Sequence, residues 1–261
     1  MMVDIQRNRE SEMKEYVLLT GASSGVGREL AIELSKNYSL ILNGRDYERL
    51  LETKQKCSKN KDVLIWKYDL SQCESLENEL SEWIKNQDIV ISAFIHCAGI
   101  MKMLPCKVLS YGVLEEIYRV NVFSAALIVK TLIAKKINGK NLKNVVFISS
   151  NISNRGAKAF STYGSSKAAL DGLMRNLAME LAPNIRVNSI LPGGMMTEMT
   201  KDIFEDIEMK EHFSKIYPLG IGSPDYIAPM VEFLLSEKAS WITGQQFVID
   251  GGRTIDITEK A

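Results

Sequence analysis

Short apolar runs and stretches with helical spacing alternate along the whole chain. Seven of these runs, each bounded by polar or turn-forming residues, predict buried strands. They lie at residues 16–19, 40–43, 63–69, 91–97, 144–150, 185–191 and 245–250. Between the runs, apolar residues recur three or four positions apart, as in Val26, Leu30 and Leu34, and this spacing predicts amphipathic helices. The two longest helical stretches are expected near residues 112–136 and 163–181.

An alternation of buried strands and helices predicts an α/β fold. Apolar strands joined through helices form a parallel sheet that is covered on both faces, with right-handed crossover connections. We therefore expect a doubly wound parallel sheet of about seven strands. No internal repeat or low-complexity linker divides the 261 residues, and a chain of this length can bury one complete core. We expect a single domain over residues 15–261, preceded by a mostly polar, disordered extension over residues 1–14.

Charge and composition argue against several other classes of protein. Lys and Arg together number 32, as do Asp and Glu, so the basic excess of a nucleic-acid-binding protein is absent. The longest apolar run, residues 122–134, is interrupted by Lys130 and is too short to span a bilayer. The polar N-terminus lacks the apolar segment of a signal peptide. The four cysteines have neither zinc-site nor disulfide-framework spacing, so we expect no metal site and reduced thiols in a cytoplasmic protein.

A glycine-rich turn follows the first predicted strand. The segment TGASSGVG places Gly21, Gly25 and Gly27 between that strand and a helix. Glycine allows a tight turn and a close backbone approach, and a helix N-terminus offers unpaired N–H groups and the positive end of its dipole. A turn of this kind inside the first β-α-β unit is the context that a dinucleotide pyrophosphate requires. The sequence therefore predicts a dinucleotide-binding site.

The end of the second predicted strand bears on the choice of cofactor. In dinucleotide-binding folds an acidic side chain at this place suits the 2′-hydroxyl of NAD, and an Arg suits the 2′-phosphate of NADP. Here Gly44 is followed by Arg45, whose guanidinium can form charge-assisted bidentate contacts with a phosphate. The alternative is a loop Arg paired with Asp46 or Glu48. We expect NADP(H) to be preferred, with NAD(H) as a possible cofactor.

Eight motifs, in order along the chain, resemble those of the short-chain dehydrogenase/reductase family. They are TGASSGVG (20–27), YDL (68–70), HCAG (96–99), VNV (120–122), ISS (148–150), YGSSK (163–167), LPGGMMT (191–197) and ITGQQFVIDGG (242–252). The resemblance extends from about Tyr16 to Gly252. It implies a single-domain Rossmann fold and an NAD(P)-dependent oxidoreductase that interconverts a carbonyl and a secondary alcohol by hydride transfer.

Tyr163 and Lys167 lie four positions apart, so they share one face of a helix. A free Tyr titrates near ~10, and a nearby Lys ammonium stabilises the phenolate, so we expect Lys167, helped by the positive charge of an oxidised nicotinamide, to lower the pKa of Tyr163. The resemblance implies that Tyr163 protonates the carbonyl oxygen and that Lys167 also holds the nicotinamide ribose. It implies further that Ser150 hydrogen-bonds to the substrate oxygen and that the backbone of Asn121 orders a water in the proton relay.

The same resemblance implies the cofactor contacts. Asp69 and Leu70 are expected to border the adenine, and Thr197 the carboxamide or the pyrophosphate. Pro192 and Gly193 either turn the chain below the nicotinamide or form a plain turn. The full set of expected cofactor-binding residues is Gly21, Ser23, Ser24, Gly25, Val26, Gly27, Arg45, Asp69, Leu70, Cys97, Ala98, Gly99, Tyr163, Lys167, Pro192, Gly193, Met195 and Thr197.

Some positions depart from the family's pattern. His96 and Cys97 replace two asparagines; we expect His96 to be a hydrogen-bonded core residue and Cys97 to meet the cofactor through its backbone. Ser24 stands where many NADP-preferring members carry a second basic residue. His212 lies in a variable region and is expected on the surface. Five methionines either line an apolar substrate cleft or fill gaps in the packing: Met101, Met103, Met195, Met196 and Met199.

The substrate segment, residues 194–235, most resembles that of the 3-oxoacyl-ACP reductases, through the turn at residues 218–220 and the helix start that follows it. Those reductases usually carry an Arg that docks the acidic carrier protein, but Met179 occupies that place here. Lys135, Lys136 and Lys140 offer another source of positive charge, so docking of a carrier protein stays open.

Two alternatives to an acyl reductase remain. The first is a dehydrogenase of a sugar, polyol or other small ketone. The second is a non-catalytic NADP-binding scaffold or sensor, although such relatives typically lose the Tyr or the Lys that this chain retains. Because family members are usually dimers or tetramers, the resemblance also implies a homo-oligomer that acts on a small carbonyl or alcohol.

Overall fold

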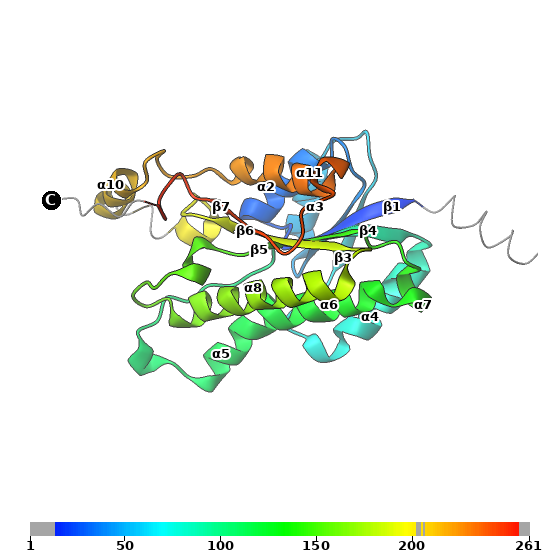
Figure 1. The fold of residues 1–261 in the computed structure, drawn as a ribbon, viewed down its shortest axis with the longest axis horizontal. Helices are drawn as coiled ribbons and strands as arrows, with labels where there is room; N and C mark the ends of the chain where they lie inside the picture. Colours follow the sequence, from blue (N-terminus) through cyan, green and yellow to red (C-terminus); the bar gives the residue numbers. More distant parts are fainter. Residues whose placement is uncertain (1–13, 202–204, 206, 256–261) are drawn as a thin grey trace, which may run out of the picture.

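The computed structural model describes residues 14–201, 205 and 207–255. Seven parallel strands form one sheet in the order β3-β2-β1-β4-β5-β6-β7 (Figure 1). Their bounds are β1 (Glu15–Thr20), β2 (Leu40–Gly44), β3 (Val63–Lys67), β4 (Val90–His96), β5 (Asn144–Ile148), β6 (Arg186–Pro192) and β7 (Gln246–Ile249). Each strand coincides with one of the predicted apolar runs to within a few residues. The predicted single-domain α/β fold with a seven-stranded parallel sheet is confirmed.

Helices cover both faces of the sheet (Figure 1). One layer contains α2 (Gly25–Leu34), α3 (Tyr47–Lys56) and α11 (Ala228–Leu235), and the other contains α4 (Cys73–Gln87), α6 (Ser124–Ile133) and α8 (Ser161–Leu181). Side chains alternate across a strand, so β1 sends Leu18 into one core and Val17 and Leu19 into the other. Burial on both faces explains why these strands appear in the sequence as continuous apolar runs.

The helical stretch expected near residues 112–136 is divided in the structure. It consists of α5 (Tyr111–Tyr118), a π-helical turn (Arg119–Phe123), α6 and α7 (Lys135–Asn138). Ala134 between α6 and α7 has extended backbone angles. The π turn places Asn121 in the interior, where its side chain bonds to the backbone of Ile100.

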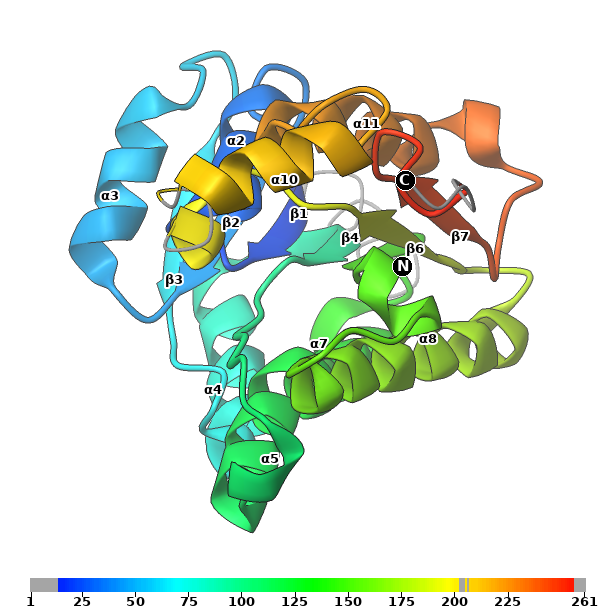
Figure 2. The same ribbon diagram turned by 90° about the vertical axis from the view of Figure 1, so that its left-hand side faces the viewer.

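The strand order reverses at β1, which pairs with β2 on one side and with β4 on the other. At such a point the connections leave in opposite directions and open a crevice beyond the carboxyl ends of the strands, where ligands bind in open α/β sheets. Beyond β6, α10 (Ile207–Ile216) lies near this end of the sheet (Figure 2). Among the described helices, none is long and apolar enough to cross a membrane. The expected disordered extension falls almost wholly on residues 1–13, outside the described residues.

Candidate active site

A cavity of about 500 Å³ lies at the carboxyl ends of the strands, in the size range of small-molecule and cofactor sites. Figure 2 views the molecule from this end. The cavity extends from the end of β2, past the ends of β1 and β4, to the segment after β6. Every site residue expected from the sequence lines its wall except Asn121. The fold thus brings these separate motifs to one continuous cavity.

The glycine-rich turn between β1 and α2 is packed so closely that it excludes side chains. Gly21 has φ +70°, and a Cβ on it would lie 2.7 Å from the backbone of Ala98. A Cβ on Gly27 would lie 2.1 Å from the carbonyl oxygen of Gly21. Ser24, the N-cap of α2, makes no side-chain capping bond, which leaves the first N–H groups of the helix available to an anion. These features fit a pyrophosphate held by backbone groups.

Arg45 is exposed on the cavity wall directly after β2. The neighbouring Asp46 caps α3, accepting a hydrogen bond from the backbone N–H of Arg49 at 3.2 Å, and the Arg49 guanidinium forms an ion pair with Glu198. Arg45 itself forms no ion pair with another described residue, including Asp46 and Glu48. The alternative pairing considered for Arg45 is therefore not found, and its guanidinium can meet a ligand.

Ser150, Tyr163 and Lys167 meet on the cavity wall although they come from two segments. Ser150 follows β5, and the first turns of α8 carry Tyr163 and Lys167. The Ser150 hydroxyl accepts from the backbone N–H of Ile152 at 3.3 Å and lies near enough to the Tyr163 phenol to lower the pKa of that phenol. The Lys167 Nζ donates to the carbonyl oxygen of Ile148 at 2.8 Å and lies 5.8 Å from the centroid of the Tyr163 ring. A carbonyl group that enters here can meet two hydroxyl groups beside a cation.

Burial dominates the protonation states of this cluster. It raises the pKa of Tyr163 to about 12, and the nearby Ser150 hydroxyl offsets only part of that rise. Burial also lowers the pKa of Lys167 to about 8. The protein alone therefore does not lower the pKa of Tyr163, because loss of solvent around the phenolate dominates; the lowering expected with an oxidised nicotinamide stays a prediction. At neutral pH, Tyr163 is a protonated donor.

Asn121 lies behind the cavity wall and is fully buried. Its side-chain oxygen accepts from the N–H of Ile100 at 2.8 Å, and its side-chain nitrogen donates to the Ile100 carbonyl at 3.1 Å and to the Ser166 hydroxyl at 2.9 Å. A Cβ on Gly99 would lie 3.4 Å from the Asn121 Oδ1 and 3.3 Å from the Lys167 Nζ. The Asn121 side chain thus supports the loop that follows β4.

His96 is the hydrogen-bonded core residue that the sequence predicts. Its Nδ1 lies 3.0 Å from the Thr20 hydroxyl, which also accepts from the N–H groups of Cys97 at 3.2 Å and Ala98 at 3.3 Å. Burial lowers the pKa of His96 to about 3 and raises that of Cys97 to about 12, so both are neutral near pH 7. These two residues therefore shape the loop after β4 without adding charge to it. His212 is exposed, as predicted.

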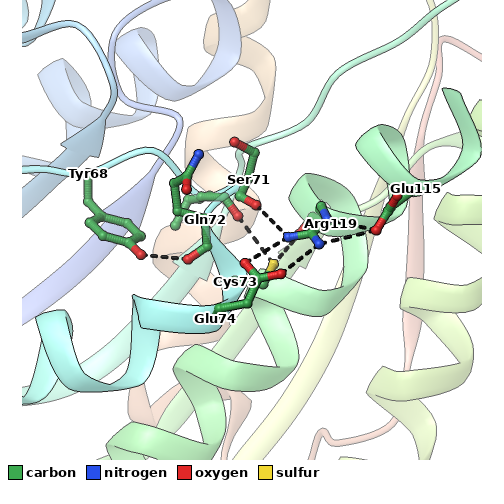
Figure 3. Close-up of polar contacts among 8 residues, drawn as sticks. Tyr68, Ser71, Gln72, Cys73, Glu74, Glu115 and Arg119 are labelled. Carbon is green, nitrogen blue, oxygen red and sulfur yellow. Dashed lines mark hydrogen bonds and ion pairs between the residues drawn. The ribbon is translucent and has the colours of Figure 1, made fainter. Parts of the chain in front are cut away.

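Arg119 holds the segment that directly follows Asp69 and Leu70, through bonds to Ser71 and Glu74 (Figure 3). Its guanidinium donates to both carboxylate oxygens of Glu74, at 2.9 and 2.6 Å, and to Glu115. It also donates to the backbone carbonyl of Ser71 at 3.1 Å (Figure 3). Arg119 is also the first residue of the π turn that carries Asn121. It therefore links the turn after β3 to Asn121, which supports the loop after β4.

The cavity beyond Tyr163 contains residues that sequence reasoning did not single out. The apolar ones are Ile152, Phe160 and Phe213, and the polar ones are Asn151, Thr200 and Tyr217. Phe160 packs against Tyr163 with ring centroids 6.2 Å apart, and the Tyr217 hydroxyl accepts from the N–H of Gly194 at 2.8 Å. A possible sequence signal was proximity: Phe160 and Asn151 lie within three residues of predicted site residues.

The methionines divide between the two alternatives left open by the sequence. Met101, Met195 and Met199 line the cavity, whereas Met103 and Met196 are exposed away from it. The charged residues on the wall that the structure describes are Arg45, Asp46, Arg49, Asp69 and Lys167. All except Lys167 follow β2 or β3. The part of the wall beyond Tyr163 is therefore mainly apolar and carries no charged side chain among the described residues.

The family described as "Enoyl-(Acyl carrier protein) reductase" matches residues 21–254. The 3-oxoacyl-[acyl-carrier-protein] reductase of Buchnera aphidicola subsp. Schizaphis graminum is 33% identical over 241 residues, 92% of this chain and 97% of the relative. The L-rhamnose 1-dehydrogenase (NADP(+)) of Thermoplasma acidophilum is 30% identical over 258 residues, 92% of this chain and 96% of the relative. A solved 4-hydroxyisoleucine dehydrogenase complexed with NADH has a TM-score of 0.85 at 28% identity and covers 93% of this chain and 99% of its own.

Proposed function

Because this chain belongs to the short-chain dehydrogenase/reductase family and is an oxidoreductase that acts on CH–OH groups with NAD(P), we propose that it is an NADP(H)-dependent reductase of 3-oxoacyl thioesters. One observation carries the choice of substrate. Beyond Tyr163 the described cavity wall is formed by Met101, Ile152, Phe160, Met199 and Phe213, with no charged side chain.

An apolar wall suits an acyl chain better than a sugar. A polyol or a carboxylate that leaves water needs several hydrogen-bond donors or a cation in exchange, because a buried polar group without partners is unfavourable. On this part of the described wall the polar side chains are Asn151, Thr200 and Tyr217. The Tyr217 hydroxyl is already bonded to Gly194, and the Thr200 hydroxyl donates to the carbonyl of Met195. A 3-oxoacyl chain requires polar contacts mainly at its two carbonyl groups.

The proposed chemistry uses the cluster as it stands in the structure. A bound nicotinamide would supply hydride chemistry at the carbonyl carbon. We assign Tyr163 as the acid that gives its phenolic proton to the carbonyl oxygen, since the phenol is protonated at neutral pH. Ser150 hydrogen-bonds to the same oxygen, and the Lys167 ammonium stabilises the negative charge that develops on Tyr163. Asn121 acts behind them by holding the loop after β4.

The preference for NADP(H) is supported by Arg45. Its guanidinium lies on the wall at the end of β2 without an ion-pair partner among the described residues, where a 2′-phosphate is expected. Substitution Arg45→Asp would place a carboxylate there, repel that phosphate and accept hydrogen bonds from a ribose. We therefore expect Arg45→Asp to move the ratio of NADPH to NADH activity toward NADH, and an unchanged ratio would remove Arg45 from the cofactor site.

The experiment that tests the proposed substrate measures oxidation of NADPH and of NADH against a panel of carbonyl compounds. The panel contains acetoacetyl thioesters of coenzyme A and of acyl carrier protein, keto-sugars and simple diketones. We expect the highest kcat/KM for a thioester with NADPH. Higher activity on a keto-sugar would assign the enzyme to carbohydrate substrates. Tight NADPH binding with no turnover across the panel would instead support a non-catalytic sensor.

We also propose a homo-oligomer. Trp241 is 99% exposed in a single chain, and Phe233 on α11 and Val248 on the edge strand β7 are exposed as well. Large exposed aromatic and aliphatic side chains, and an open strand edge, are typical of surfaces that another protein covers. A second copy of this chain would cover both the apolar side chains and the edge of β7.

A further inference from the structure

A buried carboxylate lies one helical turn beyond Lys167. Asp171 is 1% exposed, and neither of its carboxylate oxygens has a hydrogen-bond partner among the described residues. Residues four apart on a helix lie on the same face, with their Cβ atoms about 5–6 Å apart. A buried ionised carboxylate is unfavourable unless an opposite charge lies near it. A cation close to Asp171 would therefore stabilise its ionised form.

Lys167 is the buried cation on that face of α8, whereas Arg175, four positions beyond Asp171, is exposed to solvent. The Lys167 side chain is 3% exposed, and its hydrogen bond goes to the carbonyl oxygen of Ile148, a neutral group that cannot supply a counter-charge. Burial lowers the pKa of Lys167, whereas the two acids Cys97 and Asp171 raise it. Cys97 is a neutral thiol near pH 7, because burial raises its own pKa to about 12. Asp171 is thus the acid that can carry a negative charge beside Lys167.

The other titratable groups around Lys167 keep their charge over the working pH range. His96 and Cys97 come from the end of β4, with pKa values of about 3 and about 12, and Tyr163 on α8 has a pKa of about 12. Between about pH 6 and 10, Lys167 is therefore the member of this group that changes its charge.

The elements packed on α8 bring no competing cation. From the π turn, Arg119 is engaged by Glu74 and Glu115. At the start of β6, Arg186 donates to the carbonyl oxygens of Leu234 and Ser236, around the C-terminus of α11 on the opposite face of the sheet. Val187 of β6 lies in the core that β6 shares with α8, and Ser189, two positions later, lies on the same face of the strand. On this face β6 therefore offers α8 a neutral hydroxyl.

We propose that Asp171 is the counter-charge that keeps Lys167 in its ammonium form and so sets the upper pH limit of carbonyl reduction. Asp171 contacts neither substrate nor cofactor and is a positioning residue that acts through Lys167. The inference rests on the role proposed above for Lys167. Packing alone does not explain why Asp171 is buried, because a neutral residue of the same size would be easier to bury. A role as the counter-charge of Lys167 does explain it.

The test compares the pH profile of NADPH-dependent kcat in the wild type, Asp171→Asn and Asp171→Glu. Asn keeps the size and removes the charge, and Glu keeps the charge. The control is Glu180→Gln, which removes one negative charge from an exposed position near the end of the same helix. We expect the wild-type rate to fall above about pH 8, the pKa of Lys167. In Asp171→Asn that fall should begin about one to two pH units lower, the effect of one charge at this separation.

Asp171→Glu and Glu180→Gln should keep the wild-type profile. A folded Asp171→Asn enzyme with an unmoved profile, or an equal displacement in Glu180→Gln, would overturn the proposal. A second readout does not depend on turnover: chemical unfolding of the wild type and Asp171→Asn across the same pH range. Deprotonation of buried Lys167 makes stability rise with pH, and this rise should begin at lower pH in Asp171→Asn. If no carbonyl is reduced, the proposed substrate fails while this readout still decides the role of Asp171.

Discussion

Tyr163 and Lys167 are both taken out of water, and burial favours the neutral form of each. For Tyr163 this strengthens its role as a proton donor, because the phenol stays protonated at all physiological pH values. For Lys167 it opposes the proposed role, because the ammonium form is less stable in the cavity wall than in water. The side chain compensates through its bond to Ile148 and, we propose, through Asp171. The positive charge of Lys167 is therefore stable in the cavity wall only with help from neighbouring groups.

The buried ammonium should be visible in the pH dependence of stability. The pKa of Lys167 is lowered from 10.5 to about 8, so between these values the unfolded chain binds a proton that the folded chain does not. The free energy of unfolding of the wild type should rise across this interval relative to Lys167→Met, by about 3 kcal/mol in total. Below pH 8 the two curves should run parallel. Urea unfolding of both proteins at several pH values measures this, and parallel curves up to pH 10.5 would show that Lys167 is not desolvated.

At the scale of elements, the strands could be predicted well and one helical region could not. A strand buried on both faces must be apolar along its length, so each of the seven strands is marked by its own run. The division at residues 119–123 depends on Asn121 bonding to Ile100, a contact between residues 21 positions apart that leaves no local pattern.

The same distinction separates the parts of the site that could be predicted from those that could not. The glycine turn must have glycine, since a Cβ on Gly27 would overlap the Gly21 carbonyl, and so its motif is recognisable in the sequence. Phe213 and Tyr217 reach the cavity only because the chain after β6 folds back over it. Their spacing in the sequence carries no signal of this approach. The raised pKa of Tyr163 was also missed, because burial depends on tertiary packing.

In the whole molecule, helices cover both faces of the sheet (Figures 1 and 2), but the edge at β7 is open. The cavity lies at the carboxyl ends of the strands. Among the described strands, the edge strand β7 pairs with β6 alone, and Trp241 lies exposed just before β7 in the sequence. An uncovered tryptophan beside an open strand edge is unfavourable in water and favours association.

We predict that the wild type is a dimer or tetramer and that Trp241→Glu shifts it toward smaller species at equal concentration. The introduced carboxylate would have to be buried without a partner in the assembled form. Size-exclusion chromatography with light scattering gives the mass of each species. Tyr47→Glu on α3, another exposed aromatic, is the control and should keep the wild-type mass. A monomeric wild type, or an unchanged mass for Trp241→Glu, would place no interface at this edge.

The central claim is that Tyr163 donates the proton in an NAD(P)H-dependent carbonyl reduction. The most direct measurement compares turnover and NADPH affinity in Tyr163→Phe and in the wild type, using the best substrate of the panel. The substitution removes one hydroxyl on the cavity wall beside Ser150 and leaves the glycine turn and Arg45 intact. We expect kcat to fall by about 10²-fold or more, as for the loss of a general acid, with NADPH affinity within a few fold of the wild type. Turnover close to that of the wild type would contradict the account.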